Sequence, residues 1–175
     1  MRKLLLASLM VAVLAFGVAA VTTDDATSVF NVGNNEIAVL DVSGTAGNLL
    51  LVEPATGGDA PAAVSDDTTY LQYTVVVISA ATKKITAQIT TGSLPTGTLL
   101  KATTAPAGSQ GTLQENISVT TGDAAEVLTA ISSCATGVDG TDGAKVTWTL
   151  SANTVAEMVS TEAASITITY ILTDS

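Results

Sequence analysis

The chain has 175 residues, enough for one domain with a sizeable core, and its 16 acidic residues against six basic ones give a net charge of −10. So few cations exclude binding to nucleic acid or to anionic lipid through counterion release. The lack of histidine in the sequence removes the usual general base, the serine and cysteine triads and most zinc sites.

The first 20 residues have the layout of a secretory signal peptide. Arg2 and Lys3 form a basic start, residues 4–16 carry no charge, and Val18 and Ala20 supply the small residues of a cleavage site. An uncleaved membrane anchor is the alternative, but the apolar run is at the lower limit for crossing a bilayer. We therefore expect cleavage and a secreted or cell-surface location, with transit through the periplasm in a Gram-negative cell. The cleaved chain is expected to have no membrane association.

Residues 21–175 would then form a single domain that keeps four lysines and all 16 acids, a formal net charge of about −12. Cys134 is the only cysteine in the sequence, so no internal disulfide can form and the core must hold the fold. A lone cysteine is more often a small buried apolar residue than a reactive thiol, although an intermolecular disulfide stays open. Because aromatic residues are few, the core must be built from Val, Ile, Leu and Ala.

Taken in order, the chain begins as a succession of short strands. A first strand is expected near 29–32, before a turn at 33–35. Residues 36–43 are apolar on both faces, which is typical of a strand buried between layers. Another strand is expected at 48–54, and the Pro-, Gly- and Asp-rich stretch 54–67 is predicted to be a loop.

The middle of the chain alternates between apolar and polar residues more regularly. A long strand is predicted at 69–79, and KKITAQIT at 83–90 has the cleanest period of two. The three residues that join these strands are few enough to predict a hairpin. Further strands are expected at 98–103 and 112–119.

The spacing of a helix capping box, with an acid three residues after a polar cap, occurs twice. At 123–128 it predicts a helical turn that runs into a strand near 129–135. At 153–159 it predicts a second helical turn, with Thr154 as the cap and Glu157 as its partner.

The last two strands complete the pattern. In residues 145–152, Trp148 alternates with polar residues and shares a face with two aliphatic ones, which favours a core position over a sugar-binding platform. In SITITYILT at 165–173, Ile, Tyr and Leu fall on one face and Thr on the other. With no βαβ rhythm, the sequence predicts an all-β protein, an antiparallel Ig-like (Greek-key) β-sandwich of about nine strands with one or two short helical turns.

Paired carboxylates are the one route to catalysis that the composition leaves. The adjacent pairs are Asp24 with Asp25 and Asp66 with Asp67, and both fall in stretches predicted to be polar loops. A glycosidase also needs a sugar cleft, which is normally lined with aromatic residues that this chain has in small number. Solvated turns therefore explain the pairs better, and no catalytic or cofactor-binding residue is expected.

Calcium is the one ion that the sequence suggests. The loop 135–144 carries Asp139 and Asp142 among glycines, and oxygen ligands on a flexible loop suit a hard cation. The spacing is not that of an EF-hand, and Asp-Gly pairs are also ordinary turn residues. Asp139 and Asp142 are thus candidate calcium ligands, with turn formation as the alternative.

Four stretches of the C-terminal part carry a family resemblance: KKITAQI, LPTGTLLKA, the Gly/Asp loop before VTWTLS, and the closing SITITYILT with Tyr170 near its end. Across residues 68–173 the chain resembles secreted bacterial surface β-sandwiches of the fimbrial and spore-coat-U-like kind. The resemblance implies a structural subunit whose sheet is completed by a strand of the next subunit. Cys134 departs from this pattern, since many fimbrial subunits have an internal disulfide.

The sequence supports two main hypotheses about function. The first is a secreted non-enzymatic structural or adhesive cell-surface protein, fimbrial-like, which associates with itself or with other surface proteins. If it forms filaments by strand addition, residues 21–32 are the candidate donor. The alternative is an extracellular module that binds calcium or a glycan through the loops at one end of the sandwich. A hydrolase that uses only acids such as Asp66 or Asp139 ranks third.

Overall fold

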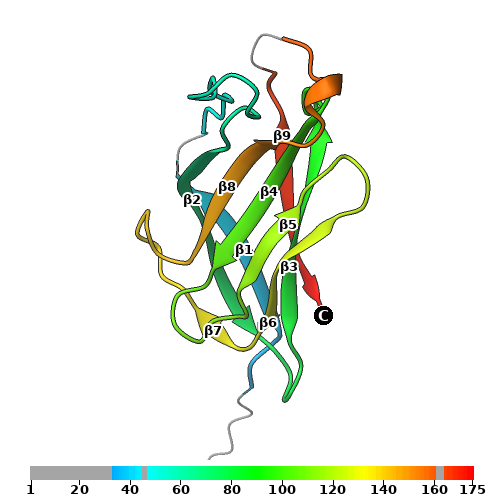
Figure 1. The fold of residues 1–175 in the computed structure, drawn as a ribbon. Helices are drawn as coiled ribbons and strands as arrows, with labels where there is room; N and C mark the ends of the chain where they lie inside the picture. The colour runs from blue at the N-terminus through cyan, green and yellow to red at the C-terminus, as the bar shows by residue number, and fades with distance from the viewer. Residues whose placement is uncertain (1–32, 45–46, 161–163) are drawn as a thin grey trace, which may run out of the picture. The chain divides into compact units, whose positions relative to one another are not determined.

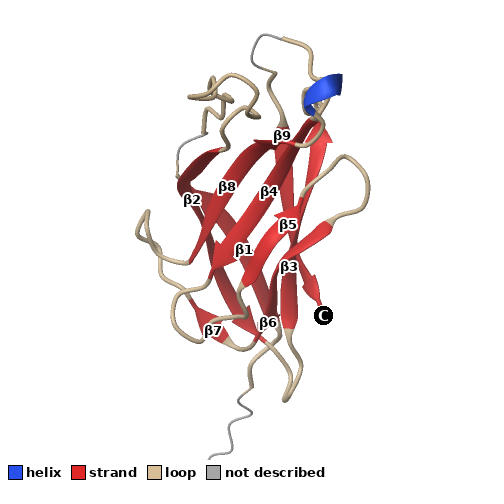
Figure 2. Ribbon diagram, in the orientation of Figure 1, coloured by secondary structure: helices blue, strands red, loops and turns tan. Residues whose placement is uncertain are grey.

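The computed structural model describes residues 33–44, 47–160 and 164–175. Within the compact unit Asn34–Ser175 they form nine strands in two antiparallel sheets, one of six strands and one of three (Figures 1 and 2). The all-β sandwich predicted from the sequence is confirmed. Within the described part of the chain, no helix is long and apolar enough to cross a membrane.

The larger sheet has the order β1-β2-β8-β4-β5, and β7 adds to the end of β2. Its strands are β1 (Ile37–Ser43), β2 (Val64–Val76), β4 (Thr98–Ala105), β5 (Gln114–Ser118), β7 (Cys134–Ala135) and β8 (Ala144–Ala152). The smaller sheet has the order β6-β3-β9, with β3 (Lys83–Thr91), β6 (Ala125–Ile131) and β9 (Thr167–Asp174). For β3, β4, β5, β8 and β9 the predicted ends differ from the observed ones by at most two residues.

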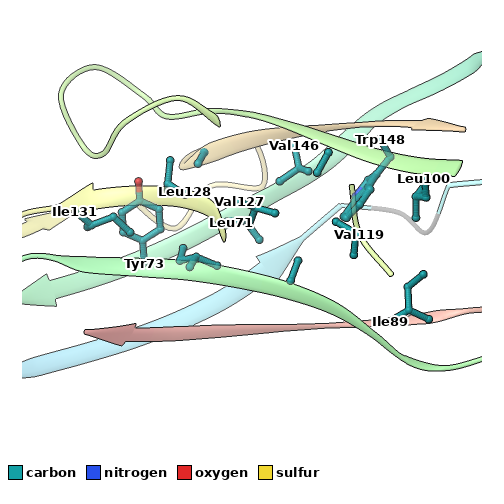
Figure 3. Packing of buried hydrophobic residues seen from close by; sticks show 14 of the residues in the cluster. Leu71, Tyr73, Ile89, Leu100, Val119, Val127, Leu128, Ile131, Val146 and Trp148 are labelled. Atoms are coloured by element: carbon teal, nitrogen blue, oxygen red, sulfur yellow. The ribbon is translucent and has the colours of Figure 1, made fainter. Parts of the chain in front are cut away.

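The core lies between the sheets and is mainly aliphatic (Figure 3). Period-two alternation sends every second side chain of β3 and β8 into it, as predicted. Trp148 is 6% exposed, and its ring centre lies 6.4 Å from that of Tyr170 on the opposite sheet. Trp148 is therefore a core residue, which confirms the sequence prediction.

The predicted hairpin between residues 69–79 and 83–90 is wrong. β2 belongs to the larger sheet and β3 to the smaller one, so the connection between them crosses the sandwich. A turn closed by the hydrogen bond from Ala81 N–H to the Ile78 carbonyl (2.9 Å) redirects the chain. A connection this short can join two strands of one sheet or span the gap between two sheets, so its length does not decide which occurs.

The prediction for residues 48–67 is also wrong in its boundaries. The expected strand at 48–54 is reduced to one isolated bridge between Val52 and Ala62. β2 starts at Val64, inside the predicted loop, so Asp66 and Asp67 belong to a strand rather than to a polar loop. A polar segment forms a strand here because β8 supplies its backbone partners, with a bulge between Asp66 and Thr69.

The strand predicted at 36–43 is the edge strand β1 (Ile37–Ser43) rather than a strand buried between layers. Most of its side chains are exposed, including Val39 at 58%. Apolar residues on both faces indicate that both faces could be buried. Whether they are depends on the neighbouring elements, and among the described residues β1 has a strand partner on one side only, β2.

One of the two predicted helical turns is confirmed. Residues 155–157 form a 3-10 turn after Thr154, although the Thr154 side chain makes no capping hydrogen bond. The turn predicted at 123–128 is wrong, because residues 125–131 are strand β6. Glu126 of the supposed capping box instead reaches across to Lys84 on β3. The turn expected at 33–35 is not formed either.

The core position of Leu71 provides a direct test of this fold. Leu71 has no exposed surface and faces the smaller sheet from the middle of β2. Leu71→Ala should lower the free energy of unfolding by about 2–5 kcal/mol, because it removes buried methyl groups and leaves a cavity. Ile78→Ala, in the exposed β2–β3 connection, should change it by less than about 0.5 kcal/mol. Equal effects of the two variants in urea unfolding would contradict the assigned core.

Candidate functional site

The two candidate calcium ligands form a turn with each other in the loop between β7 and β8. The Asp139 backbone N–H donates to Asp142 Oδ2 at 3.0 Å, and the Asp142 N–H donates to the Asp139 carbonyl at 2.8 Å. A Cβ atom on Gly137 would collide with the Asp142 carboxylate, so this acid lies against the backbone of its own loop. No group of three or more His, Cys, Asp or Glu side chains within the described ranges could hold a metal ion. Calcium binding at Asp139 and Asp142 stays a prediction.

The neighbouring acids Asp66 and Asp67 serve separate partners. Asp66 Oδ1 accepts hydrogen bonds from the N–H (3.3 Å) and hydroxyl (2.9 Å) of Thr68, which shapes the bulge of β2. Asp67 forms an ion pair with Lys145 on β8. Hydrogen bonding and charge attraction from Lys145 lower the pKa of Asp67, and the same contact raises the pKa of Lys145. Asp24 and Asp25 lie outside the described residues.

Cys134 lies in the two-residue strand β7, half-buried against the core. Burial raises the pKa of its thiol, which disfavours the reactive thiolate. Its position fits the small apolar residue expected from the sequence. An intermolecular disulfide at Cys134 stays a prediction.

The feature that the sequence did not reveal is an incompletely covered side of the sandwich at β1. In register, Ala38, Leu40 and Val42 lie opposite the core residues Val75, Tyr73 and Leu71 of β2, so they share the inner face. The three β2 residues are at most 2% exposed. On β1, by contrast, Val42 is 46% exposed and Leu40 is only half-buried. The inner-face side chains are therefore fully buried on β2 but largely exposed on the neighbouring strand β1.

The smaller sheet shows the same loss of burial at β9. The inner residues Ile85, Ala87 and Ile89 of β3 are at most 2% exposed. Their partners on β9, which are Leu172, Tyr170 and Ile168, are only half-buried. Burial still raises the pKa of the Tyr170 hydroxyl to about 12. Since β1 and β9 approach each other, the two incompletely covered edges belong to one side of the molecule, which we call the open side.

The opposite side of the sandwich is closed by the chain itself. The Val119 N–H donates to the Leu100 carbonyl of β4 at 3.0 Å, and the Ile89 N–H of β3 donates to the Thr120 carbonyl at 3.0 Å. Residues 119–120 thus pass from one sheet to the other, and Val119 has no exposed surface. The asymmetry between this side and the open side singles out β1 and β9 as the candidate interface.

An ionic cluster of Lys83, Glu36 and Asp174 links the strands at one end of the open side. Lys83 starts β3 on the same face as the core residues of that strand, and its side chain is 8% exposed. Its Nζ lies 2.7 Å from Glu36 Oε1, just before β1, and 2.7 Å from Asp174 Oδ1, at the end of β9. One buried ammonium group therefore connects β1, β3 and β9. The sequence contained a signal for this buried lysine, because in an alternating strand Lys83 falls on the same face as the apolar residues Ile85, Ala87 and Ile89.

Comparison with known proteins adds no assignment. No protein-family model, curated protein or solved structure matches this chain. What can be said of its function therefore rests on the sequence and on the open side.

The ionic cluster predicts a specific response to alkaline pH. Hydrogen bonds that the Lys83 ammonium donates to Asp174 and then to Glu36 raise the pKa of Lys83 above its ordinary value of 10.5, with burial acting in the opposite direction. A raised pKa in the folded state means that this stabilisation is fully present below pH 10.5 and is lost as the pH rises through the raised value. The melting temperature of the wild type should thus fall relative to that of Lys83→Met above pH 10.5.

Lys84→Met provides the matched control for this experiment, because it removes a lysine from the outward face of the same strand. Melting curves of all three proteins across the alkaline range separate the cluster from the general effect of high pH. A difference between wild type and Lys83→Met that stays constant through this range would contradict the raised pKa.

Proposed function

We propose that this chain is a secreted, non-enzymatic structural or adhesive protein of the cell surface that associates with copies of itself. The observation that carries the proposal is the edge strand β1 on the open side, where Val42 of the inner face and Ile37 and Val39 of the outer face are 41–58% exposed. Edge strands of stable monomers usually carry lysine, proline or a bulge that discourages pairing. β1 has none of these, and Asp41 is its single charged residue.

The inner face of β1 supports association by an added strand. A strand placed beside β1 would extend the larger sheet over the half-buried residues of β9 and would pair with backbone groups of β1. One of these groups, the Val42 N–H, already donates to Asp41 Oδ1 at 2.8 Å, so an added strand would have to compete with that contact. Residues 21–32 are the candidate donor. Twelve extended residues reach about 40 Å, which exceeds the roughly 23 Å length of a seven-residue strand such as β1.

Donation to a second copy is part of the proposal. Among the described residues just before β1, 33–36 form no turn of the kind that a tight hairpin with β1 would need. Residues 21–32 themselves lie outside the described residues. Their donor role is part of the proposal and rests on their place in the sequence.

Deletion of residues 21–32 tests the donor role. The mature wild type should form oligomers or filaments visible by negative-stain microscopy, and the deletion should leave a soluble monomer by light scattering. Wild-type protein that is monomeric at every concentration would contradict self-association itself. Filaments that persist unchanged after the deletion would remove only the donor role.

A lysine on the free edge tests whether β1 is the acceptor. Val39→Lys places a charge at an exposed edge position and should reduce association at least about tenfold, because pairing would have to desolvate the new ammonium group. Ala107→Lys, in the exposed β4–β5 loop, makes the same change of charge away from β1 and should associate like the wild type. Equal association of all three proteins in sedimentation velocity would exclude β1 as the acceptor.

A further inference from the structure

A depression of about 490 Å³ lies on the outer face of the larger sheet. Its lining includes Asp67, Thr68, Tyr70, Thr141 and Lys145. Tyr70 on β2 and Lys145 on β8 are direct partners in register, next to the core pair Leu71 and Ala144, so their side chains face away from the core. The bulge of β2 forms one wall, and the β7–β8 loop forms another.

The walls of this depression are held in place by contacts from several elements. The Ser43 hydroxyl donates to the Gly140 carbonyl at 2.9 Å, which ties the end of β1 to the β7–β8 loop. Gln72 Nε2 donates to the Asp139 carbonyl, and the mutual hydrogen bonds of Asp139 and Asp142 stiffen the same loop. A Cβ atom on Gly44 would collide with the Thr68 carbonyl, so this close approach requires glycine. Walls that are formed in advance cost a ligand little conformational entropy.

The groups in the depression suit a particular class of ligand. The ammonium of Lys145 is paired with the Asp67 carboxylate, so neither group offers a net charge to an ion. Together with Thr141, which also lines the depression, they offer donors and acceptors side by side, as a polyhydroxylated ligand requires. The Tyr70 ring adds an apolar surface against which the CH face of a sugar ring can pack.

A second depression shows what this one has in addition. It measures about 290 Å³ and lies around the ion pair of Lys84 and Glu126, with Thr82 and Thr129 also in its lining. It therefore has a lysine–carboxylate pair and threonine hydroxyls, as the first depression does. It has no aromatic side chain in its lining. The Tyr70 ring is the difference, and the Lys84 site supplies a matched control.

We propose that the depression around Tyr70 and Lys145 binds a neutral saccharide unit. Tyr70 packs against the sugar ring, and the pair of Asp67 and Lys145 hydrogen-bonds adjacent hydroxyls. None of the residues that line the depression belongs to β1 or β9, so saccharide binding and self-association can be tested with separate variants.

Ligand-observed saturation-transfer NMR on the mature protein tests this proposal. The probes are the methyl glycosides of glucose, galactose, mannose and N-acetylglucosamine, with glucuronic acid as a charged comparison, each at about 1–10 mM to match a weak single-sugar affinity. At least one neutral glycoside should receive saturation and outcompete glucuronic acid. Tyr70→Ala should weaken its binding at least about fivefold, and Lys84→Ala should leave it unchanged.

A second variant keeps the result clear if Tyr70→Ala fails to fold, which circular dichroism would show. Asp67→Asn preserves the size of the side chain and removes its charge, and it should also weaken binding. No saturation transfer to any neutral glycoside in the wild type would overturn the proposal. Wild-type binding in both Tyr70→Ala and Asp67→Asn, or equal weakening by Lys84→Ala, would overturn it as well.

Discussion

The two sheets of this sandwich differ in width, and that mismatch shapes most of its surface. Five strands lie side by side in the larger sheet and three in the smaller, which corresponds to about 19 Å against about 10 Å of sheet. Three strands cannot cover the inner faces of five. Other parts of the chain must cover the flanks, or the flanks stay exposed to solvent.

The chain treats the two flanks differently. On one side residues 119–120 bridge the sheets and bury Val119 completely. On the other, Leu40 of the inner face of β1 packs partly against the core, yet Ala38 and Val42 of the same face stay exposed. Lys83 fastens this side at one end through Glu36 and Asp174. In a domain without an internal disulfide, this buried ionic contact thus adds to the backbone pairing of β1 with β2 and of β9 with β3.

Much of the strand pattern could be predicted, because alternation of side chains depends only on the local backbone. It placed β3, β8 and β9, and it put Trp148 in the core. The alternation pattern gave wrong predictions for elements whose structure depends on residues distant in sequence. Residues 36–43 have the composition of a buried strand but lie at an edge, and Glu126 of the apparent capping box pairs with Lys84 on another strand. The candidate sites escaped prediction for the same reason, since the Tyr70 depression and the Lys83 cluster each join residues distant in sequence.

By itself the sequence determined the class of fold, the aliphatic nature of the core and the inward faces of β3, β8 and β9, because parity along an extended chain needs no knowledge of neighbours. Only the tertiary structure decided which strands share a sheet, which edge stays open and which polar residues meet. Those outcomes depend on which connections cross from one sheet to the other and on which backbone groups pair. No short stretch of residues encodes either of these.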